Sequence, residues 1–123
     1  MGQYFLIANT EKKEYISPHD LGSGAKMAEI MGTPRVGAFL MFLLGNSDGK
    51  GGGDLQSNDR ERPKHQSEMD YFGHWANNRI EIIGDYDSSQ KYDKIRNEYT
   101  KVPQSAIEEY NSTRFAEYDG YSI

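Results

Sequence analysis

The stretch Pro34–Leu44, PRVGAFLMFLL, decides the fold, because it is the one long apolar run in the chain. Thr33 can cap a helix here, Pro34 suits the first helical position, and Gly45 is typical of a helix end. A helix of this length is about 16 Å long, too short for the roughly 20 residues that cross a bilayer. Because it is apolar on nearly all sides, we predict a central helix that other elements surround.

Four segments around this helix predict strands. Residues 3–8 (QYFLIA) are apolar on both faces, which is typical of a central strand. Residues 14–17 return as the second strand of a hairpin. Residues 79–84 (RIEIIG) place Ile80 and Ile82 on one face, and residues 98–102 favour a last edge strand.

Further helices are predicted over residues 25–31 and 89–97, and a third opens at Pro103 with Ser105 and Glu108 as a capping box. The mixture indicates an α+β fold in which a mostly antiparallel sheet packs against the buried central helix and two or three short helices. We expect one domain over residues 1–123, with residues 56–70 as a mobile surface insertion and residues 112–123 as a tail without regular structure.

The composition excludes several classes of function. Nineteen acidic against fourteen basic residues give a net charge of −5, which argues against direct binding of nucleic acid through its phosphates. The absence of cysteine excludes disulfides and thiolate zinc sites. No signal, lipidation or membrane-spanning pattern is recognisable, so we expect a soluble, cytoplasmic protein. Nine tyrosines predict either half-buried sheet surface or a binding face.

Residues 45–55 (GNSDGKGGGDL) form a glycine-rich loop. Its spacing fits neither a Walker phosphate loop nor an EF-hand. The amides of Gly51, Gly52 and Gly53 could form a nest for an anion, with Asp54 beside them. The alternative is a tight turn that passes close to the central helix, and the permissive backbone of glycine is sufficient to explain it.

Charged residues flank the predicted strand at 79–84. Asp85 and Asp87 could share a ligand or serve as acid–base groups, or they could simply occupy a solvated turn. Arg79 could bind a phosphate or carboxylate, or pair with Asp54 or Asp85. The three histidines have no metal-ligand spacing and no catalytic triad is recognisable, so we expect no metal and no cofactor.

Four motifs in order give a resemblance: residues 1–4 (MGQY), 17–27 (SPHDLGSGAKM), 51–55 (GGGDL) and 73–87 (GHWANNRIEIIGDYD). They are similar to a family of small uncharacterised proteins that open with MGQY and carry an LGSG-like segment, a GGGD loop and a GxWAGDRI…GDY signature. The resemblance implies no known activity. It implies one recurring set, namely Gly22, Gly24, Gly51, Gly52, Gly53, Asp54, Trp75, Arg79, Gly84, Asp85 and Tyr86.

This sequence departs from the family pattern at Asn77 and Asn78, where the pattern has Gly and Asp. If that aspartate were catalytic, Asn78 could not replace it as a base. We therefore expect a non-enzymatic protein that holds a small anionic or nucleotide-like ligand, or a protein partner. The ligand-binding residues we predict are Gly51, Gly52, Gly53, Asp54, Trp75, Arg79, Asp85 and Tyr86.

Two other functions compete with this prediction. One is a metal-assisted phosphoester or nucleotide hydrolase that uses Asp54, Asp85 and Asp87. The other is an acidic inhibitor of the phage-encoded type, which would occupy the nucleic-acid-binding groove of a basic partner.

Overall fold

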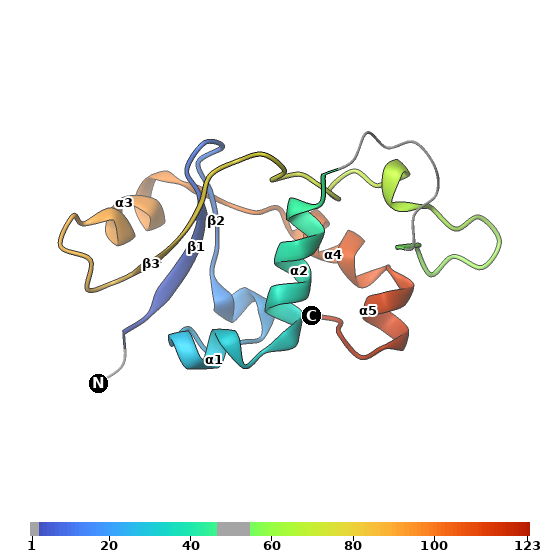
Figure 1. The fold of residues 1–123 in the computed structure, drawn as a ribbon, viewed down its shortest axis with the longest axis horizontal. Helices are drawn as coiled ribbons and strands as arrows, with labels where there is room; N and C mark the ends of the chain where they lie inside the picture. The colour runs from blue at the N-terminus through green and yellow to red at the C-terminus, as the bar shows by residue number, and fades with distance from the viewer. Residues whose placement is uncertain (1–2, 47–54) are drawn as a thin grey trace. The chain divides into compact units, whose positions relative to one another are not determined.

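The computed structural model describes residues 3–46 and 55–123, and it has a small α+β fold, as the sequence predicts (Figure 1). The backbone divides into two units, each assembled from two separate segments. Unit 1 comprises Met1–Val36 and Asn78–Val102, and unit 2 comprises Gly37–Asn77 and Pro103–Ile123. Within the described part of the chain, no helix has the length and apolarity needed to span a membrane.

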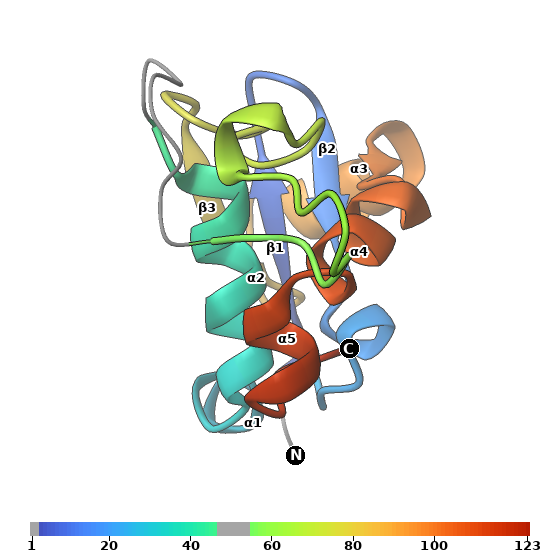
Figure 2. The ribbon, with the colours of Figure 1, turned by 90° about the vertical axis from the view of Figure 1, so that its right-hand side faces the viewer.

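Unit 1 contains a mixed sheet in the order β3-β1-β2-β4. The strands are β1 (Phe5–Asn9), β2 (Glu14–Ile16), β3 (Ile80–Gly84) and β4 (Thr100–Lys101). β1 pairs antiparallel with β2 and with β3, whereas β2 and β4 are parallel. Figure 2 shows β1 between β3 and β2, which confirms both the predicted hairpin and the central place of the first strand.

The two faces of β3 differ in burial. Ile80 and Ile82 share one face, as predicted, but Ile82 is 47% exposed. Ile83, on the other face, is only 7% exposed and belongs to a core cluster with Leu6 and Ala8. The strand thus contributes Ile83 rather than Ile82 to the core.

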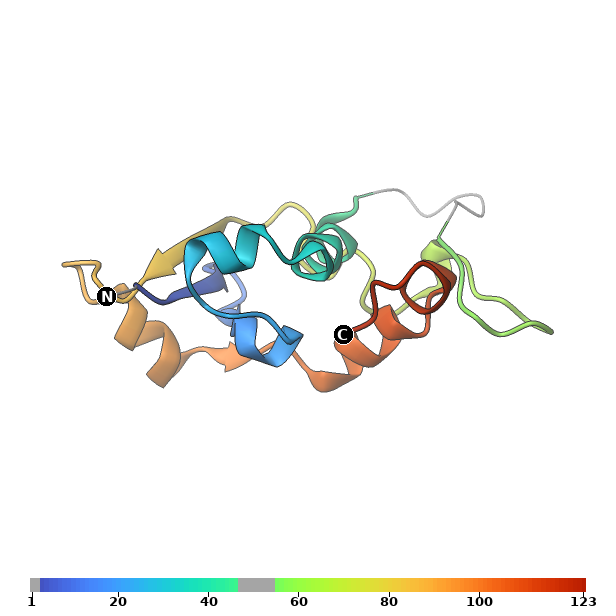
Figure 3. The same ribbon diagram turned by 90° about the horizontal axis from the view of Figure 1, so that it is seen from below.

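Helix α3 (Lys91–Glu98) covers the face of the sheet that carries Ile83 (Figure 3). Its Ile95 completes the core cluster, and Tyr92 and Tyr99 pack against the same cluster. The other helices of this unit are η1 (Pro18–Leu21) and α1 (Met27–Met31), which follow β2 in the chain.

Helix α2 spans Pro34–Leu44, the bounds predicted from the capping and helix-terminating residues around the apolar run. Phe39 and Leu43 are fully buried, but Met41 is 71% exposed. The expectation that other elements surround this helix on nearly all sides is therefore wrong. An apolar run longer than one face of a helix leaves some of its side chains in solvent.

The last two helices, α4 (Gln104–Asn111) and α5 (Arg114–Tyr118), belong to unit 2. Tyr110 of α4 packs edge-on against Phe39 and Phe42 of α2, with ring centroids 5.4 and 5.8 Å apart. The predicted capping box at the start of α4 is wrong: the cap is Pro103, and the Ser105 hydroxyl donates to the Tyr71 hydroxyl at 2.8 Å.

The expectation of a tail without regular structure over residues 112–123 is also wrong. Thr113 caps α5, because its hydroxyl oxygen accepts a hydrogen bond from the Ala116 N–H at 3.1 Å. The last residues are held as well. The Asn111 amide donates to the Ile123 carbonyl at 3.1 Å and accepts from its N–H at 2.7 Å.

Residues 56–70, which we predict to be a mobile surface insertion, contain some local structure. Gln56 pairs with His65 and Ser57 pairs with Thr113 as antiparallel bridges, and η2 (Gln66–Glu68) adds a short turn of 3₁₀-helix. The Glu109 carboxylate accepts the N–H groups of residues 70 and 71 at 2.9 and 2.7 Å. Polar residues can thus build ordered structure by hydrogen bonding to a neighbouring helix.

Candidate functional site

The predicted ligand-binding residues separate into three groups. Gly51, Gly52, Gly53 and Asp54 lie outside the described residues. Trp75 belongs to unit 2 and has no exposed surface. Arg79, Asp85 and Tyr86 all belong to unit 1, so their positions can be compared with one another.

Trp75 has a structural role. Its backbone N–H donates to the Leu43 carbonyl at 2.8 Å, and the Gly73 N–H donates to the Phe42 carbonyl at 2.9 Å. These are two of the last four carbonyls of α2, which have no partner inside the helix. The GHW segment therefore caps the C-terminal end of α2, and the buried indole of Trp75 is not available to a ligand.

Arg79 and Asp85 lie at opposite ends of β3. The Arg79 carbonyl accepts the Thr10 N–H at 3.1 Å, and the Asp85 N–H donates to the Tyr4 carbonyl at 2.8 Å, so the hydrogen bonds to the β1 segment extend from Arg79 to Asp85, where the turn begins. At about 3.3 Å per residue the two Cα atoms are about 20 Å apart. The predicted pocket that combines Arg79 with Asp85 is therefore wrong, because an extended strand separates its own ends.

The two aspartates after β3 are engaged within the turn. Asp85 Oδ1 accepts the Tyr4 N–H at 3.1 Å. Asp87 accepts hydrogen bonds from the Ser89 hydroxyl and, at 3.4 Å, from the Lys91 N–H. The pKa of Asp87 is lowered, chiefly by the Ser89 hydroxyl. Among the residues described, no group of three or more histidine or acidic side chains is arranged to hold a metal.

The two asparagines that depart from the family pattern have local structural roles. Asn77 has a φ of +65°, a left-handed conformation that glycine adopts freely and asparagine tolerates. Asn78 Oδ1 accepts a hydrogen bond at 2.9 Å from Asn9, a buried residue whose own Oδ1 accepts the N–H groups of Glu11 and Lys12. Asn78 thus supports the β1–β2 turn.

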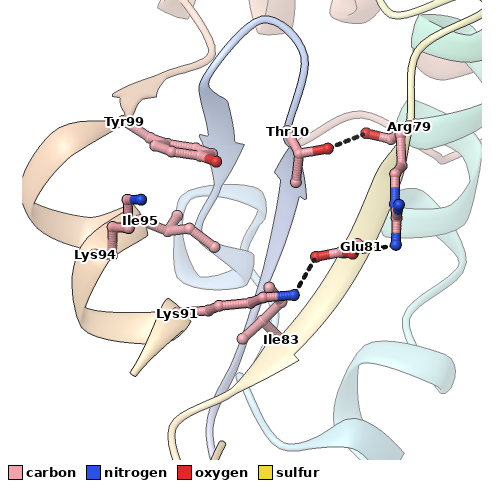
Figure 4. Close-up of a pocket in the computed structure, with 8 residues that line it drawn as sticks. All are labelled: Thr10, Arg79, Glu81, Ile83, Lys91, Lys94, Ile95 and Tyr99. Carbon is pink, nitrogen blue, oxygen red and sulfur yellow. Dashed lines mark hydrogen bonds and ion pairs between the residues drawn. The ribbon is translucent and has the colours of Figure 1, made fainter. Parts of the chain in front are cut away.

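Two clefts of unit 1 flank α3 on the same face of the sheet. The first, which we call the β3 cleft, has a volume of about 300 Å³ and is shown in Figure 4. It is lined by Thr10, Arg79, Glu81, Ile83, Lys91, Lys94, Ile95 and Tyr99. The Glu81 carboxylate lies between Arg79 and Lys91, at 2.9 and 3.6 Å, so two of the three cations are already paired.

The second cleft, which we call the tyrosine cleft, has a volume of about 460 Å³. It is lined by Tyr4, Phe5, Leu6, Tyr15, Ser17, His19, Ala25, Tyr92, Arg96 and Lys101. Sheet register brings several of these together, because Tyr15 is opposite Ala8 on one side and pairs with Lys101 on the other.

Helix α3 determines which side chains enter each cleft. Tyr92 and Arg96 are four residues apart and share one side of the helix, while Lys91 and Lys94 line the β3 cleft. The Arg96 guanidinium lies over the Tyr92 ring, 6.0 Å from its centroid. Burial is the main cause that raises the pKa of Tyr92, so its hydroxyl remains protonated at neutral pH.

The electrostatics of the tyrosine cleft differ from those of the whole chain. His19, Arg96 and Lys101 line it, and no carboxylate is among its described lining residues, although Asp85 and Asp93 are close enough to contribute to the raised pKa of Tyr92. Lys101 pairs with Asp20 at 3.1 Å, outside the lining. The described lining of this cleft is therefore aromatic and basic, although the chain has a net charge of −5.

Comparison of the chain with protein-family models, with curated proteins and with solved structures gives no match. The resemblance based on the MGQY, LGSG, GGGD and GDY motifs stays a prediction. So do the two alternative functions, the hydrolase and the acidic inhibitor.

Sequence reasoning on charged turns missed the tyrosine cleft. The relevant signal was the excess of tyrosine, because Tyr4, Tyr15 and Tyr92 all line this cleft. These residues are distant in the chain, and only the strand register and the packing of α3 bring them together.

Proposed function

We propose that this protein is a non-enzymatic binding protein whose tyrosine cleft takes a small ligand with an aromatic ring and an anionic group, as in a nucleoside monophosphate. The observation that carries the proposal is the lining of the cleft, which among the described residues consists of aromatic rings and basic side chains without a carboxylate. The volume of about 460 Å³ is within the range of about 300–1,000 Å³ that is typical of small-molecule sites.

Each part of the lining would recognise one part of the ligand. The rings of Tyr4 and Tyr92 offer flat surfaces on which an aromatic base can stack. Arg96 can bind a phosphate or carboxylate through two N–H groups, and Lys101 adds a second positive charge. Ser17 supplies a hydroxyl that can donate to a ligand oxygen or accept from a ligand N–H.

Isothermal titration with a panel of nucleoside monophosphates tests the proposal, with free nucleosides and inorganic phosphate as partial ligands. We expect binding of the monophosphates and weaker binding of either part alone. Arg96→Gln should weaken binding by about 10- to 100-fold, since a hydrogen bond to a charged group contributes about 1.5–3 kcal/mol. Tyr92→Leu should weaken it by a similar factor through lost stacking.

Lys94→Gln is the matched control. It removes the same charge from the same helix, but Lys94 lines the β3 cleft. If Lys94→Gln weakens binding as much as Arg96→Gln does, the binding is a general effect of charge and the proposed site is wrong. Absence of binding to every member of the panel also contradicts the proposal.

A further inference from the structure

The two outer strands of the sheet differ in how their free edges are protected. β4 has only two residues, ends at a lysine and is followed closely by Pro103, three features that prevent further pairing of strands. β3 has five residues and contains no proline or lysine. An open groove of about 570 Å³ borders it, lined in part by Ile82, Gly84 and Tyr86.

The hydrogen bonds at the two ends of β3 show which backbone groups face this edge. Residues 79 and 85 bond to β1, through the Arg79 carbonyl and the Asp85 N–H. Because bonding alternates along an antiparallel strand, the odd-numbered residues face β1. The N–H and C=O groups of Ile80 and Ile82 and the N–H of Gly84 therefore point away from β1, toward an edge that no other described strand pairs with, whereas the Gly84 carbonyl already accepts the Asp87 N–H at 3.1 Å.

We propose that two copies of this chain pair through β3, antiparallel and with a twofold axis at Ile82. The sheet would then continue from one copy into the other. In this register Ile82 is opposite Ile82 of the second copy, and Ile80 is opposite Gly84. Each of these pairs joins residues that face outward, so the Ile82–Ile82 pair and the Ile80–Gly84 pair, which occurs twice by symmetry, are pairs of the hydrogen-bonded type.

Charge complementarity selects this partner and this register. Arg79 and Asp85 lie three residues before and after Ile82, so each Arg79 is opposite Asp85 of the second copy. Arg79 directly precedes β3 and Asp85 directly follows it in the turn, so the two opposite charges meet at each end of the paired strands, twice by symmetry. The chain thus carries opposite charges at the two ends of one exposed edge, which makes the edge complementary to itself.

The remaining side chains of the strand are compatible with this pairing. Ile82, at 47% exposure, is an apolar side chain at the centre of the proposed interface. Glu81 is paired with Arg79 and also with Lys91 within its own copy, so it keeps Lys91 as a partner when Arg79 binds Asp85 of the second copy. None of these contacts uses the residues of the tyrosine cleft, so the inference is independent of the proposed ligand.

Sedimentation velocity over a wide range of concentrations tests the pairing. We expect the wild-type chain to change from 14.0 kDa to twice that mass as its concentration rises. Arg79→Asp places two aspartates opposite each other and should abolish the dimer, and Asp85→Arg should do the same with two arginines. The double variant Arg79→Asp/Asp85→Arg should dimerise again, and Lys94→Asp is the control for a change of net charge.

Ile82→Pro provides a second test, since proline removes an N–H that the sheet of the monomer does not use. We expect this variant to keep the circular dichroism spectrum of the wild type and to remain monomeric. Amide exchange at Ile80, Ile82 and Gly84 should slow with rising concentration in the wild type only. A wild type that stays monomeric, or a dimer that survives both Arg79→Asp and Ile82→Pro, overturns the proposal.

Discussion

Replacement of Gly73 by alanine tests the account of how α2 ends. Gly73 has a φ of +76°, and a Cβ at this position would lie 2.5 Å from the carbonyl oxygen of Gly45. That neighbour is backbone, so the turn itself has to move. The movement disturbs the two hydrogen bonds by which Gly73 and Trp75 cap the carbonyls of Phe42 and Leu43.

The expected loss follows from these two effects. A left-handed conformation costs a residue with a side chain about 1–2 kcal/mol. Each capping hydrogen bond contributes about 0.5–1.5 kcal/mol, and both are weakened. We therefore expect Gly73→Ala to lower the free energy of unfolding by about 3 kcal/mol.

Two other glycines of the same unit allow the cost of the left-handed backbone to be separated from the cost of the steric clash. Gly120 also has a positive φ, +84°, but a Cβ there would meet nothing within 4 Å. Gly120→Ala should therefore cost only the conformational term of about 1–2 kcal/mol. Gly37 lies inside α2 with nothing within 4 Å of its Cβ position, so Gly37→Ala should stabilise by about 0.5–1 kcal/mol.

Urea denaturation followed by tryptophan fluorescence measures all three changes. Trp75 is the one tryptophan of the chain, it is fully buried, and it belongs to unit 2 with the three glycines. The reasoning is refuted if Gly73→Ala destabilises no more than Gly120→Ala. The helical assignment of residue 37 is refuted if Gly37→Ala lowers the unfolding midpoint.

Two further predictions concern unit 1. Burial raises the pKa of Tyr92 above 10.0, so its stabilising contribution is complete below about pH 10 and is lost as the pH rises through the higher folded-state pKa. Tyr92→Phe should thus lose less stability than the wild type as the pH rises above about 10, and equal losses in urea titrations would contradict this. Ile83→Ala should cost about 2–4 kcal/mol and Ile82→Ala less than about 1 kcal/mol, and the reverse order in urea unfolding would mean that the faces of β3 are misassigned.

Local signals in the sequence account for the elements that were predicted well. The bounds of α2 follow from Thr33, Pro34 and Gly45, which act on their immediate neighbours. The central place of β1 follows from apolar residues on both of its faces. These signals need no knowledge of the rest of the fold.

Features that depend on distant partners were missed or misplaced. Helix α5 depends on the buried Thr113, which is not followed three residues later by the glutamate of a capping box. The prediction that Arg79 and Asp85 share a pocket was wrong because charged and turn-forming residues occur at the two ends of a strand as they do around one loop. The tyrosine cleft was not predicted, because its lining comes from β1, β2, β4, η1 and α3, and the sequence does not show how these elements are placed.

The interleaving of the two units has a consequence for biosynthesis. Unit 1 is completed only by Asn78–Val102, and unit 2 only by Pro103–Ile123, so neither unit is a continuous piece of chain. During translation the β1–β2 hairpin is synthesised early. The strand β3, which pairs with β1, lies more than 70 residues further along the chain and is synthesised later. The exposed edge of the hairpin would be a natural target for chaperones, and fragments cut at any single point would leave at least one unit incomplete.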